Sequence, residues 1–231
     1  MDLHILSGGA AQGVVKALQQ QFLADTGADL KGTFGAVGMM KEKLLSGAPC
    51  DVMILTQALV EELENTGRVE PGSAAPLGRV KTGVAVKSGE TQPDVSSADG
   101  LRAALLAARG IYFPDPQKAT AGIHFINVVK KLGILAEVEP ALRPFPNGAT
   151  AMAAMAAADE AGLLGCTQVT EILYTEGVTL VAALPAEFEL ATVYTAAVST
   201  RADQPELARR LVALLSGEES RALREKGGFE L

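Results

Sequence analysis

Several residue types that mark common classes of protein are missing from this chain or scarce in it. Among its 231 residues there is no tryptophan, aromatic residues make up 4%, and there are two cysteines and two histidines. Cys50 and Cys166 belong to no C-x-x-C pair, and their spacing indicates neither a zinc site nor a particular disulfide. We therefore expect two buried thiols, and the sequence implies no metal and no cofactor.

An excess of basic charge and a long apolar run are also missing. The chain has 20 Lys and Arg against 27 Asp and Glu, a net charge of −7, so DNA phosphates would repel it and no nucleic-acid partner is expected. No run is apolar enough to insert into a membrane. Residues 1–9 (MDLHILSGG) lack the features of a secretory leader. As written, the chain is expected to be cytoplasmic; if a leader was removed, it is expected to be periplasmic, with a transporter as partner.

What the chain does have is a regular alternation of strand-like and helix-like segments. Apolar residues make up 48% of it, and up to Gly67 the order is strand, helix, three times over. This order predicts a parallel sheet with right-handed crossovers. Residues 67–78, rich in Gly, Pro, Ala and Ser, are expected to be a loop. Further strands are predicted within residues 79–89, 110–115, 136–145, 162–168, 178–185 and 189–199, and further helices at 97–109, after 119, after 147 and within 204–227.

Four turns from a strand into a helix consist mainly of small residues: 7–10 (SGGA), 35–38 (GAVG), 119–122 (ATAG) and 146–149 (PNGA). Helix N-termini carry unpaired N–H groups and partial positive charge, and small side chains let an anion approach them. Any single turn of this kind can also be small for steric reasons alone. Two turns from each half of the chain together predict a site for a small oxyanion or carboxylate. The candidate ligand-binding residues are Ser7, Gly8, Gly9, Ala10, Ala36, Val37, Arg79, Thr120, Ala121, Gly122, Asn147, Gly148, Thr167 and Gln168.

Individual polar residues leave two interpretations open. Arg79 can hold a carboxylate with its guanidinium or be a solvated charge at the start of a strand. Thr120 and Asn147 can contact a ligand or simply cap a helix. His124 can act as a general base, although a lone histidine in such a helix is more often structural. No Ser-His-Asp set, paired-carboxylate motif or phosphate-binding loop is present, so the sequence names no catalytic residue.

Three segments, in chain order, resemble blocks of the bacterial periplasmic molybdate-binding proteins. Residues 44–55 (LLSGAPCDVMIL) are similar to that family's GAPADVFISAD block. Residues 113–134 (FPDPQKATAGIHFINVVKKLGI) resemble its DPxxxPAGxYAxxxLxxLG block, and residues 204–229 resemble its C-terminal helix pair. The resemblance implies the α/β type II periplasmic-binding-protein fold, with two lobes, a hinge crossed twice and a ligand cleft between the lobes. It places residues 1–80 and 195–231 in lobe 1 and residues 81–194 in lobe 2.

The resemblance departs from the family pattern at the ligand. The family's molybdate-binding hydroxyls are not retained: Ser7 is displaced in the first turn, the second turn has no hydroxyl, and Thr167 stands near the position of the family's late tyrosine. Residues 163–173 and 184–189 are more similar to a branch that includes bacterial aconitate isomerases. Two functions therefore stay open: binding of an organic carboxylate or oxyanion, or an isomerase that shifts a double bond in a small polycarboxylate by proton transfer. A ligand-sensing domain acting through another chain is a third alternative.

Overall fold

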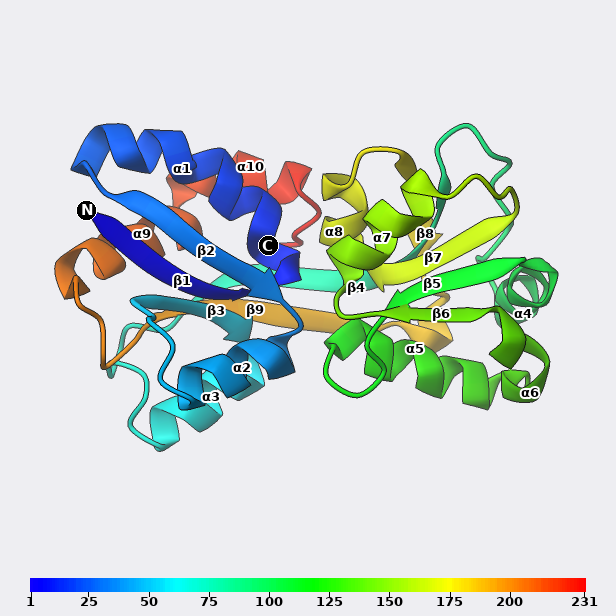
Figure 1. The fold of residues 1–231 in the computed structure, drawn as a ribbon, viewed down its shortest axis with the longest axis horizontal. Coiled ribbons are helices and arrows are strands. Elements are labelled where there is room, and N and C mark those ends of the chain that lie inside the picture. Colours follow the sequence, from blue (N-terminus) through cyan, green and yellow to red (C-terminus); the bar gives the residue numbers. More distant parts are fainter. The chain divides into compact units, whose positions relative to one another are not determined.

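The chain forms two α/β units and passes between them twice. The computed structural model describes residues 1–231, and each unit has its own sheet with helices on both faces (Figure 1). Unit 1 comprises Met1–Val80 and Thr192–Leu231, and unit 2 comprises Lys81–Ala191. The α/β class is the one that the alternating pattern predicts.

Unit 1 is built on a four-stranded sheet in the order β2-β1-β3-β9. The strands β2, β1 and β3 are parallel, and β9 runs antiparallel to β3. In Figure 1 the helices α1, α9 and α10 lie on one face of this sheet, and α2 and α3 lie on the other. The elements are β1 (Asp2–Gly8), α1 (Gln12–Thr26), β2 (Asp29–Gly35), α2 (Val37–Leu45), β3 (Val52–Thr56), α3 (Gln57–Asn65), the start of β4 (Ala75–Lys87), β9 (Ala191–Val198), α9 (Pro205–Ser216) and α10 (Arg221–Lys226).

The apolar pattern explains why these segments form a layered unit. The strand β3 is buried on both faces, as its uninterrupted VMIL run predicts for a central strand. The helix α9 buries Ala208, Leu211, Val212 and Leu215, which share one helical face at spacings of three and four residues. The helix α1 ends at Gly27, whose φ of 73° is a left-handed conformation that glycine adopts without strain.

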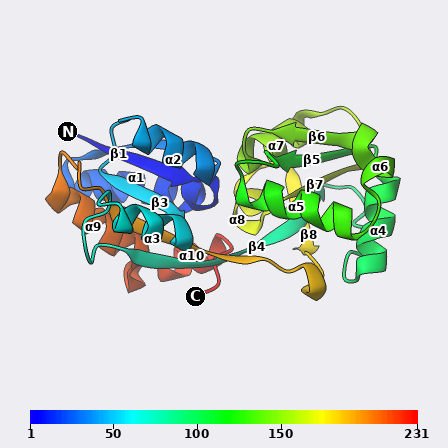
Figure 2. The same ribbon diagram turned by 90° about the horizontal axis from the view of Figure 1, so that it is seen from below.

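Unit 2 is built on a mixed five-stranded sheet in the order β8-β4-β7-β5-β6. The strands β7, β5 and β6 are parallel, and β4 is antiparallel to both β7 and β8. Seen from below, α5 lies in front of this sheet (Figure 2). Besides the rest of β4, the elements are α4 (Ala98–Ala107), β5 (Gly110–Pro114), α5 (Thr120–Lys131), α6 (Leu135–Val138), β6 (Leu142–Phe145), α7 (Gly148–Ala157), β7 (Leu163–Gln168), α8 (Val169–Tyr174) and β8 (Val178–Ala183).

The two faces of the sheet in unit 2 carry separate cores. Side chains alternate along a strand, so Leu163 packs with Met152 of α7, whereas Leu164 and Cys166 pack with Phe125 of α5 on the opposite face. By the same alternation, Thr167 faces α7 and Gln168 faces α5. This alternation decides which polar residues at the end of β7 meet which helix N-terminus.

The C-terminal segment is tied into unit 1 by a buried arginine. Arg224 donates hydrogen bonds to the backbone carbonyls of Leu77, Ser216 and Gly217, and to the hydroxyl of Ser220. Its guanidinium therefore connects α9, α10 and β4 through acceptors that burial would otherwise leave unpaired.

The structure differs from the sequence prediction in two short helices and one boundary. The strand β4 begins at Ala75, inside the segment predicted to be a loop. The helices α6 and α8 are four and six residues long and were not predicted, because so few residues give no clear period. Both cysteines are buried free thiols, as expected.

Candidate functional site

All four predicted turns lie where a parallel strand ends and a helix begins. The first follows β1 and enters a 3-10 turn, Gly9–Ala11, that precedes α1. The second joins β2 to α2, whose N-cap is Ala36. The third precedes α5, and the fourth joins β6 to α7. Each unit thus has two turns at the carboxyl edge of its own sheet, the edge at which α/β proteins bind ligands.

In unit 1 the first two turns touch. A Cβ atom at Gly8 would lie 2.8 Å from a methyl group of Val37 and 3.2 Å from the ring of Tyr194, so only glycine fits between them. The residues from Ser7 to Ala10 are buried, and Ser7 already donates its hydroxyl to the carbonyl oxygen of Gly8 at 2.8 Å. In unit 1, donors for an anion would therefore come from the backbone.

A buried hydroxyl without a hydrogen-bond partner also lies in unit 1. Thr195, on β9, is opposite Leu55 of β3, and its Oγ1 has no partner. Most buried polar groups in proteins are paired, so an unpaired hydroxyl requires an explanation. Sequence reasoning missed this residue because it lies inside an apolar run.

Arg79 lies on the surface of unit 1. Its side chain is 58% exposed and its Nη2 lies 3.7 Å from a carboxylate oxygen of Glu230. The backbones of the same two residues form an antiparallel bridge. Arg79 is thus an exposed charge paired with Glu230. This position favours a solvated surface charge over a group that holds a carboxylate ligand.

In unit 2 the start of α7 is packed tightly against the end of β7 and the start of α8. A Cβ atom at Gly148 would lie 2.0 Å from Thr167 Oγ1 and 2.0 Å from Glu171 Oε2, so this position admits no side chain. Thr167 donates its hydroxyl to the carboxylate of Glu171 at 2.5 Å. Asn147 caps α7, its Oδ1 accepting from the N–H of Thr150 at 2.8 Å. Two of the predicted residues, Gly148 and Thr167, therefore lie against Glu171, which was not predicted.

Glu171 is a buried carboxyl whose pKa is shifted towards neutral pH. It is 5% exposed, and no arginine, lysine or histidine is among the groups that act on it. Burial raises the pKa of its carboxyl from 4.5 to about 7, because desolvation penalises the charged form. Hydrogen bonds from the Thr167 hydroxyl and from the backbone N–H groups of Gln168 and Ala149 oppose that rise without cancelling it. The carboxyl can therefore gain or lose a proton near neutral pH.

The start of α5 lies at the other face of the same sheet edge. Ala119, its N-cap, provides no side-chain acceptor for the first turn, which contains Thr120, Ala121 and Gly122. A Cβ atom at Gly122 would lie 2.3 Å from the carbonyl oxygen of Pro114, so α5 rests directly on the end of β5. Gln168, buried at the end of β7, is opposite Thr82 of β4, whose hydroxyl is buried and has no partner.

His124 has a structural contact. Its Nε2 lies 2.7 Å from the carbonyl oxygen of Phe188, which fixes the ring within unit 2. This contact favours the structural interpretation over a general base. No group of three or more His, Cys, Asp or Glu is arranged to hold a metal ion.

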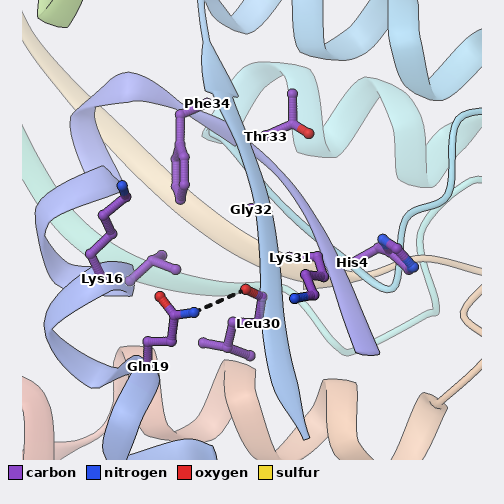
Figure 3. A pocket seen from close by; sticks show the side chains of 9 residues that line it. His4, Lys16, Gln19, Leu30, Lys31, Gly32, Thr33 and Phe34 are labelled. Carbon is purple, nitrogen blue, oxygen red and sulfur yellow. Dashed lines mark hydrogen bonds between the residues drawn. The ribbon is translucent and has the colours of Figure 1, made fainter. Parts of the chain in front are cut away.

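A separate groove of about 390 Å³ runs along β2 in unit 1 (Figure 3). Lys16 and Gln19, from α1, lie on the same side of β2 as Phe34. Gln19 donates to the carbonyl of Leu30 at 3.4 Å, and Lys31 is paired with Asp29 at 2.5 Å. The groove contains none of the predicted site residues and part of its polar lining is already bonded, so it is not the candidate site. Its lining residues are His4, Val15, Lys16, Gln19, Leu30, Lys31, Gly32, Thr33 and Phe34.

Comparison with known proteins gives the family from the sequence. A family model described as bacterial extracellular solute-binding protein matches residues 3–230. An aconitate isomerase of a Pseudomonas species is 24% identical over 234 residues, covering 99% of this chain and 87% of that protein.

Solved structures give the fold. The periplasmic molybdate-binding protein of Azotobacter vinelandii superimposes with a TM-score of 0.79 at 22% identity, covering 99% of each chain. The sulfate-binding protein of Mycobacterium tuberculosis gives 0.75 at 14% identity, covering 99% of this chain and 86% of that one. The fold is that of the type II periplasmic binding proteins, as the sequence resemblance implied. No helix of this chain is both long and apolar enough to span a membrane.

Proposed function

The chain belongs to the bacterial extracellular solute-binding protein family, and we propose that it binds a small organic carboxylate or oxyanion. The observation that carries the proposal is the pair of small-residue turns at the carboxyl edge of each sheet. Such turns offer backbone N–H groups and the positive end of a helix to an anion. In keeping with the family description, we also propose a periplasmic location and a membrane transporter as partner.

The proposed ligand-binding groups are mostly backbone donors. In unit 1 they belong to the turns at Gly8–Ala10 and at Ala36 and Val37, which consist mainly of glycine and small side chains. In unit 2 they belong to Thr120–Gly122 and to Asn147 and Gly148, with Thr167 and Gln168 at the end of β7. Arg79 takes no part in this proposal, because its side chain is exposed and paired with Glu230.

The first test is thermal unfolding in the presence of molybdate, tungstate, sulfate, phosphate, citrate, cis-aconitate and trans-aconitate. A bound ligand at a hundred times its Kd adds about 2.7 kcal/mol to the free energy of unfolding. Stabilisation by at least one of these anions, and not by matched chloride, is the expected result. No stabilisation by any of them contradicts the proposal.

A matched pair of variants then tests the position of the site. Asn147 and Ser97 are both helix N-caps of unit 2, and each accepts one backbone N–H, at 2.8 and 3.0 Å. Asn147→Ala and Ser97→Ala should each lower stability by about 1 kcal/mol, because both lose a cap. Only Asn147→Ala should also weaken ligand binding, by roughly fivefold, which is about 1 kcal/mol. Equal affinity in both variants would remove the start of α7 from the site.

A second candidate function is isomerisation of a small polycarboxylate. Two observations favour it: the aconitate isomerase matches 99% of this chain, and Glu171 is a buried carboxyl that can hold a proton near neutral pH. In such a reaction a base removes a proton from a methylene carbon, the double bond shifts by one position, and the proton returns to the former vinylic carbon. The reaction needs no co-reactant, and helix N-termini would stabilise the enolate-like intermediate.

Incubation with cis-aconitate, followed by chromatographic detection of trans-aconitate, separates the two functions. Formation of trans-aconitate that depends on protein concentration supports the isomerase. Binding of either aconitate without conversion supports a binding protein. The Glu171→Gln variant serves as the comparison, because an amide of the same shape cannot carry the proton.

A further inference from the structure

We propose that Glu171 couples ligand binding to the uptake of one proton, so that the chain holds its anion tightly at acidic pH and releases it as the pH rises. The proposal deepens the proposed function and rests on it.

The first step is geometric. The carboxylate of Glu171 occupies the N-terminal end of α7, where it accepts the N–H of Ala149 and would sit 2.0 Å from a Cβ atom at Gly148. The proposed ligand is an anion at the same turn. An ionised Glu171 therefore uses one of the donors and places a second negative charge beside the ligand, and protonation removes that repulsion.

The second step concerns what else faces this carboxyl. Two groups come from the end of β7, the Thr167 hydroxyl and the N–H of Gln168, and the third is the N–H of Ala149 from α7. All three are neutral donors, and none titrates near neutral pH. No fixed cation holds Glu171 in its ionised form, so its charge is free to follow the pH and the ligand.

The third step is the size of the effect. The pKa of about 7 means that the free protein is about half protonated at neutral pH. If the ligand binds only the protonated form, the apparent Kd is the intrinsic Kd divided by the protonated fraction. That fraction falls about tenfold between pH 6 and pH 8, so the apparent affinity should fall about tenfold as well.

The test measures the Kd values of molybdate, sulfate and trans-aconitate by titration calorimetry at pH 6 and pH 8 and constant ionic strength. Sulfate keeps its charge over this range, so a change in its affinity reports on the protein. The wild type should lose about tenfold in affinity from pH 6 to pH 8, whereas Glu171→Gln should change by less than about twofold. Glu176→Gln, an exposed carboxylate of the same unit, should behave as the wild type.

Calorimetry of the wild type alone gives an independent measure if Glu171→Gln folds poorly. Repeating the titration at pH 7 in two buffers of different ionisation enthalpy counts the protons taken up, and the expected value is about one half. Binding with the same Kd at both pH values and no proton uptake overturns the coupling and leaves the proposed function intact. Absence of binding by all three probes at both pH values overturns the coupling together with its premise.

Discussion

The replacement of Glu171 by glutamine should change how the stability of the protein depends on pH, even without a ligand. The glutamate carboxyl has a pKa of about 7 in the folded chain, against 4.5 for a model group in water. The folded state therefore binds more protons than the unfolded state between these two values. Because stability falls with rising pH wherever the folded state binds more protons, Glu171 destabilises the protein progressively as the pH rises through this window.

The magnitude follows from the two pKa values. Between pH 5 and pH 8, this one group should lower the free energy of unfolding by about 2 to 3 kcal/mol. Glutamine has nearly the same shape, accepts hydrogen bonds from Thr167 and from the backbone through its carbonyl oxygen, and carries no charge. The variant should thus lack this part of the pH dependence and gain stability relative to the wild type as the pH rises.

Urea unfolding followed by circular dichroism at pH 5, 6, 7 and 8 measures the difference. The free energy of unfolding of Glu171→Gln minus that of the wild type should increase by about 2 to 3 kcal/mol across the series. Glu176→Gln, which removes an exposed carboxylate, should show no such trend. Parallel curves for the wild type and Glu171→Gln would refute the reasoning, since they would mean that the carboxyl titrates alike in the folded and unfolded chains.

Three further predictions concern packing. Gly148→Ala should lower the free energy of unfolding by about 1 to 3 kcal/mol, because the new methyl group would overlap two oxygen atoms. In the control variant Gly35→Ala, the new methyl group would meet only a flexible methionine methyl at 3.2 Å, so the loss of stability should be smaller. Arg224→Met should lower the free energy of unfolding in urea by roughly 3 kcal/mol, because it leaves three backbone carbonyls without their donor. Arg221→Met breaks only surface ion pairs and should lower it by less than about 1 kcal/mol. Neither cysteine should react with a thiol reagent in the native protein and both should react in denaturant, since both are buried and burial raises the pKa of Cys50 to about 12.

The sequence predicts the layered fold and the strand-to-helix turns because both depend on local patterns. Alternation and helical spacing of apolar residues locate β1 to β3 and α1 to α3, and small residues mark the turns between them. Neighbouring parallel strands end at the same sheet edge, so the turns of one unit meet without further information. The contact of Gly8 with Val37 is a consequence of this kind.

Contacts between distant segments cannot be predicted in this way. Nothing near Arg79 indicates that Glu230 at the other end of the chain will pair with it. Nothing near His124 indicates that the carbonyl of Phe188 will accept its ring nitrogen. In both cases the tertiary contact favours one of two interpretations that the local sequence leaves open.

Glu171 shows which signal was missed. It lies on a helix of six residues, too short for a hydrophobic period, and its partners come from two other elements. One local signal exists. Gln168 is the N-cap of α8, and Glu171 stands three positions later. The Glu171 carboxylate accepts the N–H of Gln168, which is one of the two hydrogen bonds of a capping box. A glutamate three residues after the end of an apolar strand therefore predicts the short helix, but it does not predict the burial.

The capping contact alone does not account for a carboxylate at this position. A glutamine would accept the same N–H groups and the Thr167 hydroxyl without the loss of stability that an ionisable group brings above about pH 5. The Glu171 carboxyl destabilises the fold near neutral pH and lies against the start of α7, the helix proposed to bind an anion. Its presence is better explained by the charge it can gain and lose. The structural and functional explanations differ in one measurable respect. A purely structural Glu171 changes stability with pH but not ligand affinity, whereas a coupled one changes both over the same pH range.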